Sequence, residues 1–185
     1  MKKNALIIFG SPNQHGFTAK LTRQFTSAAA SFCVFTYLDA YKEKIKPCSA
    51  CGICDDEITC KYKDFKKIKG PIENSDLIIL ASPIYNMSLP SPLKAIIDRM
   101  QPYFAAKFRR EKFLLEPKKV VLILTCGSSD ERAPLMIRAQ VNAAFNSLSG
   151  KIIGQITWTN TDTVKKMTES TKRNLADVVA LIGDI

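Results

Sequence analysis

The sequence predicts an α/β protein with a doubly wound, five-stranded parallel sheet and helices on both faces. Short apolar runs such as 5–9 and 77–81 are typical of strands that are buried on both sides in a covered parallel sheet. Segments with apolar residues at helical spacing alternate with these runs, as they do in βα units. Because crossover connections are right-handed, such units place helices on both faces of the sheet.

Five segments carry the strand pattern. The first apolar run ends at Gly10-Ser11-Pro12, and the third is closed by Ser82-Pro83. The second is rich in β-branched and aromatic residues, which favours a strand. We expect strands at residues 5–9, 32–38, 76–81, 120–125 and 151–158.

The segments between these strands supply the helices. Phe17, Leu21 and Phe25 lie at helical spacing, and Pro92 suits the first turn of a helix after the third strand. We expect helices at residues 16–30, 64–72, 90–104, 135–148 and 164–182, a cysteine-rich loop at 41–63 and an irregular basic segment at 105–117.

Length and composition favour one domain over residues 1–185, because the 185 residues contain no linker and no internal repeat. Apolar residues make up 46% of the chain, and no apolar run reaches the roughly 18 residues that a membrane helix needs. The first residues lack the long apolar region of a signal peptide. We therefore expect a cytoplasmic protein without a disulfide framework.

The formal net charge is +10, and basic residues gather at 61–69 and 107–112. No nucleic-acid-binding motif accompanies them, so a solvated basic face is the favoured interpretation. Such a charge also attracts phosphorylated small molecules and acidic proteins. We expect no nucleic-acid partner and no membrane partner.

Ligands of doubly wound sheets bind at the carboxyl ends of the strands, which points to loops 10–17, 82–89 and 125–131. The first loop offers backbone N–H groups, hydroxyls and a helix N-terminus, a combination that suits a phosphate group. It matches neither G-x-G-x-x-G nor G-x-x-x-x-G-K-[ST], so the standard dinucleotide and nucleoside-triphosphate fingerprints are absent.

Two signatures resemble those of the flavodoxin-like NAD(P)H-dependent FMN reductases. The segment 10–18, GSPNQHGFT, is similar to that family's phosphate loop, often G-S-P-x-x-x-G-N-T. The segments 81–86, ASPIYN, and 93–99, LKAIIDR, resemble S-P-x-Y followed by L-K-x-x-x-D-R. Phe17 is a departure, because the family often has Asn at this position. The resemblance covers most of the chain and implies a flavodoxin-like fold.

The resemblance also implies that FMN binds at these three loops. The first loop would hold the phosphate, partly through the backbone of Phe17, while the other two would border the isoalloxazine ring. No catalytic side chain is implied, because hydride reaches the flavin directly. The implied cofactor contacts are Ser11, Asn13, Phe17, Thr18, Pro83, Ile84, Tyr85, Asn86, Met87, Thr125, Cys126 and Gly127.

Several other chemically notable residues favour ordinary roles. His15 is the only histidine and lies in a loop, so no Ser-His-Asp or Cys-His arrangement is expected. Trp158 and Cys33 lie in expected strands and favour the core. Asp98 and Arg99 are expected to pair within the fold or at a subunit contact.

Four of the six cysteines, Cys48, Cys51, Cys54 and Cys60, have the spacing C-x2-C-x2-C-x5-C. Structural zinc usually takes separated pairs of cysteines, whereas this compact run is typical of a [4Fe–4S] cluster. The pattern resembles the iron–sulfur flavoproteins, in which a cluster passes single electrons between an external carrier and the flavin. Free thiols in a structural loop, zinc and a disulfide remain the alternatives.

Three functions follow from these patterns. The first is an FMN-dependent oxidoreductase that passes electrons from NAD(P)H to a small acceptor such as a quinone, nitro compound or flavin. The second is an iron–sulfur flavoprotein that transfers single electrons with a ferredoxin-like partner. The third is an FMN-binding redox-sensing or regulatory module. Because the flavin would otherwise be exposed on one face, we expect a homodimer or homotetramer.

Overall fold

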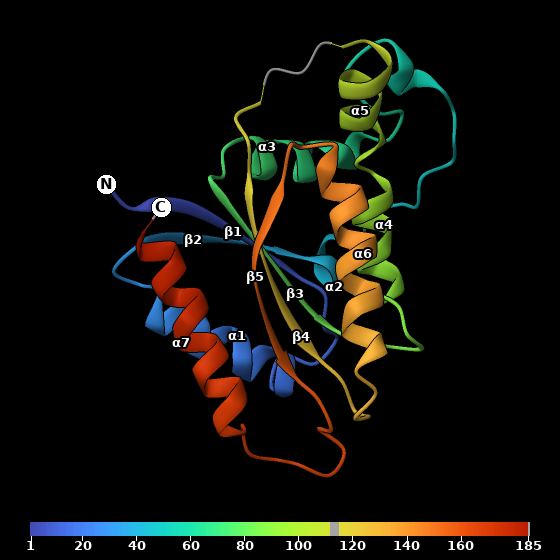
Figure 1. The fold of residues 1–185 in the computed structure, drawn as a ribbon. Coiled ribbons are helices and arrows are strands. Elements are labelled where there is room, and N and C mark those ends of the chain that lie inside the picture. Colours follow the sequence, from blue (N-terminus) through green and yellow to red (C-terminus); the bar gives the residue numbers. More distant parts are fainter. Residues whose placement is uncertain (112–114, 185) are drawn as a thin grey trace.

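The computed structural model of the protein describes residues 1–111 and 115–184 (Figure 1). Its centre is a five-stranded parallel sheet with the strand order β2-β1-β3-β4-β5, which confirms the flavodoxin-like, doubly wound fold. All five strands lie close to their predicted positions. They are β1 (Lys3–Phe9), β2 (Cys33–Asp39), β3 (Leu77–Pro83), β4 (Lys119–Thr125) and β5 (Lys151–Trp158).

Helices cover both faces of the sheet (Figure 1). One face packs on α1 (Phe17–Ala28) and α7 (Glu169–Gly183). The other face packs on α2 (Ala40–Glu43), α3 (Lys66–Glu73), α4 (Ser91–Asp98), α5 (Gln101–Phe104) and α6 (Arg132–Asn146). Short 3₁₀ turns at Ile53–Asp55 and Lys63–Phe65 and a π-helical stretch at Ala105–Arg109 complete the described elements.

Two separate hydrophobic clusters explain why the inner strands β1, β3 and β4 contain unbroken apolar runs. In β1, Leu6 and Ile8 contribute to one cluster, while Ala5, Ile7 and Phe9 contribute to the other. Successive side chains of a strand point to opposite faces, so a sheet covered on both sides needs an unbroken apolar run.

The helix boundaries differ from the prediction where a local signal overrides periodicity. The closing helix begins at Glu169 instead of residue 164, because the Thr168 side chain accepts the Thr171 N–H and caps the helix there. The predicted helix 90–104 is divided after Asp98, and Pro102 lies in the first turn of its second part.

The two segments predicted as loops contain helical turns. The cysteine-rich loop 41–63 includes the last three residues of α2 and the whole 3₁₀ turn Ile53–Asp55. The 3₁₀ turn Lys63–Phe65 begins at the last residue of that loop. The basic segment 105–117 is helical as far as Arg109, and its residues 112–114 lie outside the described residues. Across ranges 1–111 and 115–184, no helix combines the length and apolarity needed to cross a membrane.

Candidate functional site

A cavity of about 760 Å³ opens at the carboxyl ends of the strands, between the loops that follow β1, β3 and β4. Every residue that the sequence suggested as a cofactor contact lines this cavity. The lining also includes Gly16, Ser128, Ala133, Thr161 and Asp162, which were not predicted. Thr161 and Asp162 follow β5. Because the carboxyl end of β5 lies at the same edge of the sheet, its position was the signal that could have placed these two residues in the lining.

The loop after β1 is shaped by its own short side chains. Ser11 Oγ accepts the Asn13 N–H at 3.2 Å, and Asn13 Oδ1 accepts the His15 N–H at 2.9 Å. The residue before α1, Gly16, provides no side-chain cap, and the first turn carries no acidic residue. The positive end of the helix is therefore available to an anion. His15 is exposed and does not line the cavity, as expected.

Two buried hydroxyl groups join the first loop to the third. Thr18 Oγ1 and Thr125 Oγ1 lie 2.7 Å apart, and both residues line the cavity. Either hydroxyl can donate to the other, so the second can direct its hydrogen elsewhere. The pair fixes the start of α1 against the end of β4.

The loop after β3 contains a strained two-residue turn. Tyr85 and Ser88 exchange backbone hydrogen bonds of 3.0 and 2.9 Å around Asn86 and Met87. Asn86 and Met87 have φ values of 48° and 61°, in a left-handed region that costs energy for residues with a side chain. Such backbone strain is common where a turn contacts a ligand.

Phe17, the departure from the resembled signature, has a structural partner. Its ring meets the buried Trp158 edge-on, with ring centroids 5.0 Å apart, and Lys165 Nζ lies 5.6 Å from the Phe17 centroid. Lys165 also donates to the carbonyls of Thr161 and Asp162. Phe17 therefore anchors the loop after β5 beside the cavity, and Trp158 belongs to the core as predicted.

The charge of the lining is unexpected for such a basic protein. Among the described residues that line the cavity, Asp162 is the single charged side chain. A Cβ atom at Gly127 would lie 2.5 Å from Asp162 Oδ2, so only glycine fits there without a shift. A phosphate bound in this cavity would be held by N–H groups and hydroxyls instead of by a lysine or arginine.

A second cavity, of about 560 Å³, contains the cysteine cluster. Cys48, Cys51, Cys54 and Cys60 all line it, and each is a free thiol. Arg110 holds the tip of the loop by donating to the carbonyls of Cys54, at 2.8 Å, and Asp55. The structure therefore brings the four predicted ligands to one cavity.

The thiols influence one another. Burial raises the pKa of Cys54, and the neighbouring Asp55, Cys48 and Cys51 raise it further. The Ile53 backbone N–H lowers the pKa of the exposed Cys51. Within the described residues, no three cysteine, histidine or acidic side chains surround a point suitable for a single metal ion. Four cysteine thiolates are the donor set by which proteins hold many iron–sulfur clusters.

The remaining predicted residues keep their structural roles. Asp98 accepts from Lys94, and Arg99 pairs with Asp64, so both pair within the fold. Cys33 is buried in the core, where burial raises its pKa. Cys126 is buried beside the first cavity, with its Sγ 3.3 Å from Ser128 Oγ.

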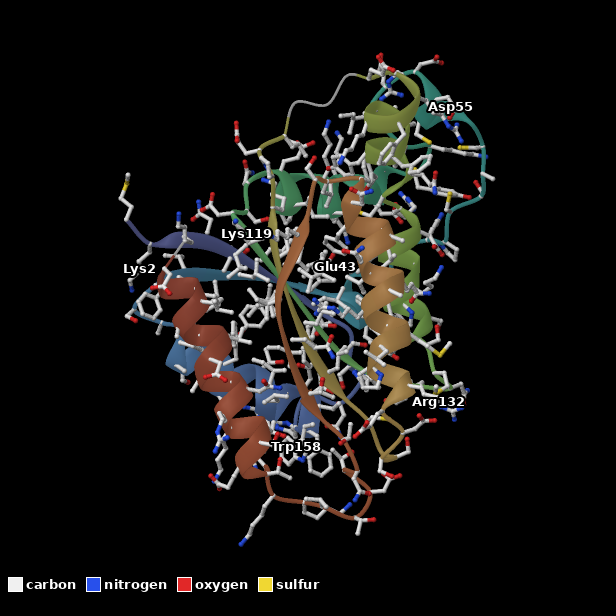
Figure 2. The ribbon with its side chains drawn as sticks, in the orientation of Figure 1. Lys2, Glu43, Asp55, Lys119, Arg132 and Trp158 are labelled. Atoms are coloured by element: carbon white, nitrogen blue, oxygen red, sulfur yellow. The ribbon has the colours of Figure 1, made fainter. Side chains whose placement is uncertain are left out.

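The two cavities lie at opposite ends of the molecule. Figure 2 shows Asp55, in the cysteine loop, far from Arg132 and Trp158 at the carboxyl edge of the sheet. Helix α4 connects the two regions, because it begins after the strained turn and ends at Asp98, which lines the cysteine cavity. Its eight residues span about 12 Å.

Comparisons with known proteins agree with this geometry. The sequence profile described as NADPH-dependent FMN reductase matches residues 4–163. An iron–sulfur flavoprotein of Methanosarcina thermophila is 32% identical over 151 residues, which cover 76% of this chain and 75% of that protein. An iron–sulfur flavoprotein of Archaeoglobus fulgidus is 34% identical over 101 residues, 54% of this chain and 46% of that protein, so the chain matches about half of that relative's length.

A solved structure supports the fold independently. The NAD(P)H:quinone oxidoreductase from Methanothermobacter marburgensis superposes with a TM-score of 0.72 at 17% identity. The superposition covers 98% of this chain and 95% of that chain. At this level of identity the likeness shows a shared fold.

Proposed function

The chain belongs to the NADPH-dependent FMN reductase family, a family of flavin-using oxidoreductases, and from that premise we propose that it passes electrons from NAD(P)H through bound FMN to a small acceptor. The observation that carries this proposal is the cavity at the carboxyl edge, where an uncapped helix end, buried hydroxyls and a strained turn meet. The acceptor class we propose is a quinone, nitro compound or free flavin.

The lining fits FMN in size and chemistry. Ligand cavities commonly enclose roughly 300–1,000 Å³, and this one has about 760 Å³. In this proposal the N-terminal end of α1, with Ser11 and Thr18, holds the phosphate. Residues 83–87 and 125–127 hold the ring and exclude water from it. FMN supplies the hydride chemistry when bound, so the protein's own residues bind and orient it.

Anaerobic mixing of the FMN-loaded protein with NADPH, and separately with NADH, tests the proposed activity. We expect at least one nicotinamide to bleach the visible flavin absorption, and a quinone or nitro compound to restore it. Failure of both nicotinamides to bleach bound FMN would refute the reductase proposal.

We also propose that a second copy of the chain covers the open side of the cavity. Support comes from exposed apolar side chains in or next to the cavity lining. Tyr85 belongs to the lining and is 47% exposed, while Leu135 and Met136 follow the lining residue Ala133 in α6 and are 63% and 52% exposed. Large apolar side chains that gather on a surface are typical of an interface. Light scattering should give a dimer or tetramer, and a monomer with full activity would contradict this arrangement.

A second candidate function is one-electron transfer through a [4Fe–4S] cluster to a ferredoxin-like partner. The four free thiols that line one cavity favour it, and a cytoplasmic, reducing location would suit it. The cluster would accept and release single electrons, while this chain's residues hold its four thiolate ligands. The basic side chains near the cavity would attract an acidic carrier.

Iron analysis separates the two candidates. Protein purified without air should contain iron and acid-labile sulfide, and Cys54→Ser should lose most of both while it retains FMN. Cys33→Ser is the matched control, because Cys33 is buried in the opposite hydrophobic cluster. A wild-type protein with flavin but no iron would exclude the cluster.

A further inference from the structure

Arg99 is a buried guanidinium in the wall of the cysteine cavity. Its side chain is 1% exposed, although arginine is rarely buried without a specific partner. The residue follows directly on α4, and its backbone N–H completes the last turn of that helix. Its position is therefore fixed by the helix that begins beside the flavin cavity.

The guanidinium joins the two ends of the cysteine loop. Arg99 Nη1 donates to the Lys46 carbonyl at 2.7 Å, before the first cysteine of the cluster. Nη2 donates to the Tyr62 carbonyl at 3.3 Å and to Asp64 Oδ1 at 2.7 Å, after the last cysteine. Asp64 Oδ2 closes the ring by accepting the Lys46 N–H at 2.9 Å.

The surroundings make this clamp a strong one. The guanidinium carbon lies 5.1 Å from the Tyr62 ring centroid and 5.9 Å from the Phe65 ring centroid, within the range of cation–π attraction. Burial raises the pKa of Asp64, but hydrogen bonds from Lys46 and Arg99 outweigh it and lower the pKa overall. Asp64 therefore remains a carboxylate partner at neutral pH.

One donor of Arg99 has no partner. Within the described ranges, Nε is buried and makes no hydrogen bond, whereas Nη1 makes one hydrogen bond and Nη2 makes two. An unsatisfied buried donor is costly, so an acceptor is expected nearby. The cavity that Arg99 lines is also lined by the four cysteines of the cluster.

We propose that Arg99, together with Asp64, is a positioning residue for the iron–sulfur group of the second candidate function. It joins the two ends of the segment 46–64, which carries the four cysteines that line one cavity. The inference depends on the proposed iron–sulfur cluster only for the group that the four cysteines would hold. The clamp itself is a property of the protein without metal.

Arg99→Lys tests the clamp because it keeps the charge, but its three N–H donors share one nitrogen and lack the planar fork that reaches three separate acceptors. Amide hydrogen exchange of the iron-free protein should accelerate about tenfold or more across residues 47–62, because local opening becomes easier. After reconstitution without air, the iron content per chain should fall to less than about half that of wild type, since ligand positions depend on their supporting contacts. FMN affinity should stay unchanged, which shows that the fold is intact.

Two further variants keep the result interpretable. Arg132→Lys is the matched control, because Arg132 pairs with Asp130 on the surface and should change neither exchange in the loop nor iron content. Asp64→Asn is a milder change, because its amide oxygen can still accept from one of its two donors. Amide exchange across residues 47–62 should accelerate in this variant by less than in Arg99→Lys. Asp64→Asn replaces Arg99→Lys as the test if Arg99→Lys does not bind FMN.

The outcomes separate the clamp from the cluster. Unchanged exchange across 47–62 in both Arg99→Lys and Asp64→Asn would overturn the clamp. If wild type does bind iron, equal iron loading of Arg99→Lys and wild type would overturn the positioning role of Arg99. A wild-type protein that takes up no iron would refute the cluster proposal instead. In that case the exchange measurement alone decides whether Arg99 holds the loop.

Discussion

Thr18 and Thr125 are 107 positions apart in the sequence, yet their hydroxyl oxygens lie 2.7 Å apart in the buried base of the first cavity. Each hydroxyl provides one donor and two acceptor sites, so the pair retains a donor for a ligand. Because no lysine or arginine lines the cavity in the described part of the chain, such donors have to hold the phosphate or the flavin.

Replacement of Thr125 by Val should weaken FMN binding about five- to tenfold, because one hydrogen bond contributes roughly 1 kcal/mol. A fluorescence titration measures the dissociation constant. Thr22→Val is the matched control, since the buried Thr22 hydroxyl donates to the Thr18 carbonyl and does not line this cavity. Equal FMN affinity of Thr125→Val and wild type would contradict the proposed contact.

Residue-level prediction from the sequence worked where a motif marks a loop. The motif residues of the three loops gather at one cavity, because the carboxyl ends of parallel strands share an edge. Asp162 and Thr161 carry no motif and were missed. The role of Phe17 also required the structure, because its partners Trp158 and Lys165 are distant in sequence.

At the scale of elements, β1 and α4 approach closely where the first loop begins. A Cβ at Gly10 would lie 2.4 Å from Leu93 Cδ2 and 3.0 Å from Leu93 Cβ. Leu93 is fully buried in α4, so it has little room to move. The glycine of the phosphate-loop signature is therefore also a contact between two elements.

Gly10→Ala should lower the free energy of unfolding by about 1–3 kcal/mol, the usual cost of an overpacked contact. Gly70→Ala in α3 is the control, because a Cβ there meets nothing within 4 Å. The control should remain within about 1 kcal/mol of wild type, since helix propensity and the following proline act in opposite directions. Denaturant unfolding measures the free energy of unfolding of both variants. Equal stabilities would show that Leu93 moves away from the new Cβ atom at no cost in free energy.

The clamp at the cysteine loop predicts a pH dependence of stability. The pKa of Asp64 is lowered in the folded protein, so its stabilisation is complete above the unfolded value of about 3.9 and is lost as the pH falls through the folded pKa. The difference in unfolding free energy between iron-free wild type and Asp64→Asn should be constant near neutral pH. It should shrink in acid, and a difference independent of pH would contradict the assignment.

The inner strands were predictable because a sheet with two covered faces requires an unbroken apolar run. Helix ends were less predictable, because they depend on single interactions such as the Thr168 cap. Helix α2 has four residues, too few for periodicity, and forms because Asp39 accepts the N–H groups of Tyr41 and Lys42. The cysteine spacing predicted convergence, but the clamp by Arg99 was visible only in the structure.

At the scale of the whole molecule, the net charge of +10 contrasts with a first cavity whose described lining holds a single charge, on Asp162. The positive field therefore acts on ligands from a distance. Salt screens such steering beyond roughly 10 Å at 0.1 M ionic strength.

The rate of flavin reduction at low NADPH concentration should fall as ionic strength rises, because electrostatic steering weakens. NADH carries fewer negative charges, so its rate should fall less. Stopped-flow mixing at several salt concentrations measures both slopes. Identical slopes for the two nicotinamides would mean that the basic surface does not guide them.

The central claim is that the cavity at the carboxyl edge binds FMN by its phosphate at the N-terminal end of α1. The most direct test is a titration of the protein with FMN and, in parallel, with riboflavin, which lacks the phosphate. The account predicts FMN affinity at least about a hundredfold higher, because several charge-assisted hydrogen bonds are lost with the phosphate. Equal affinities, or no FMN binding at all, would contradict it.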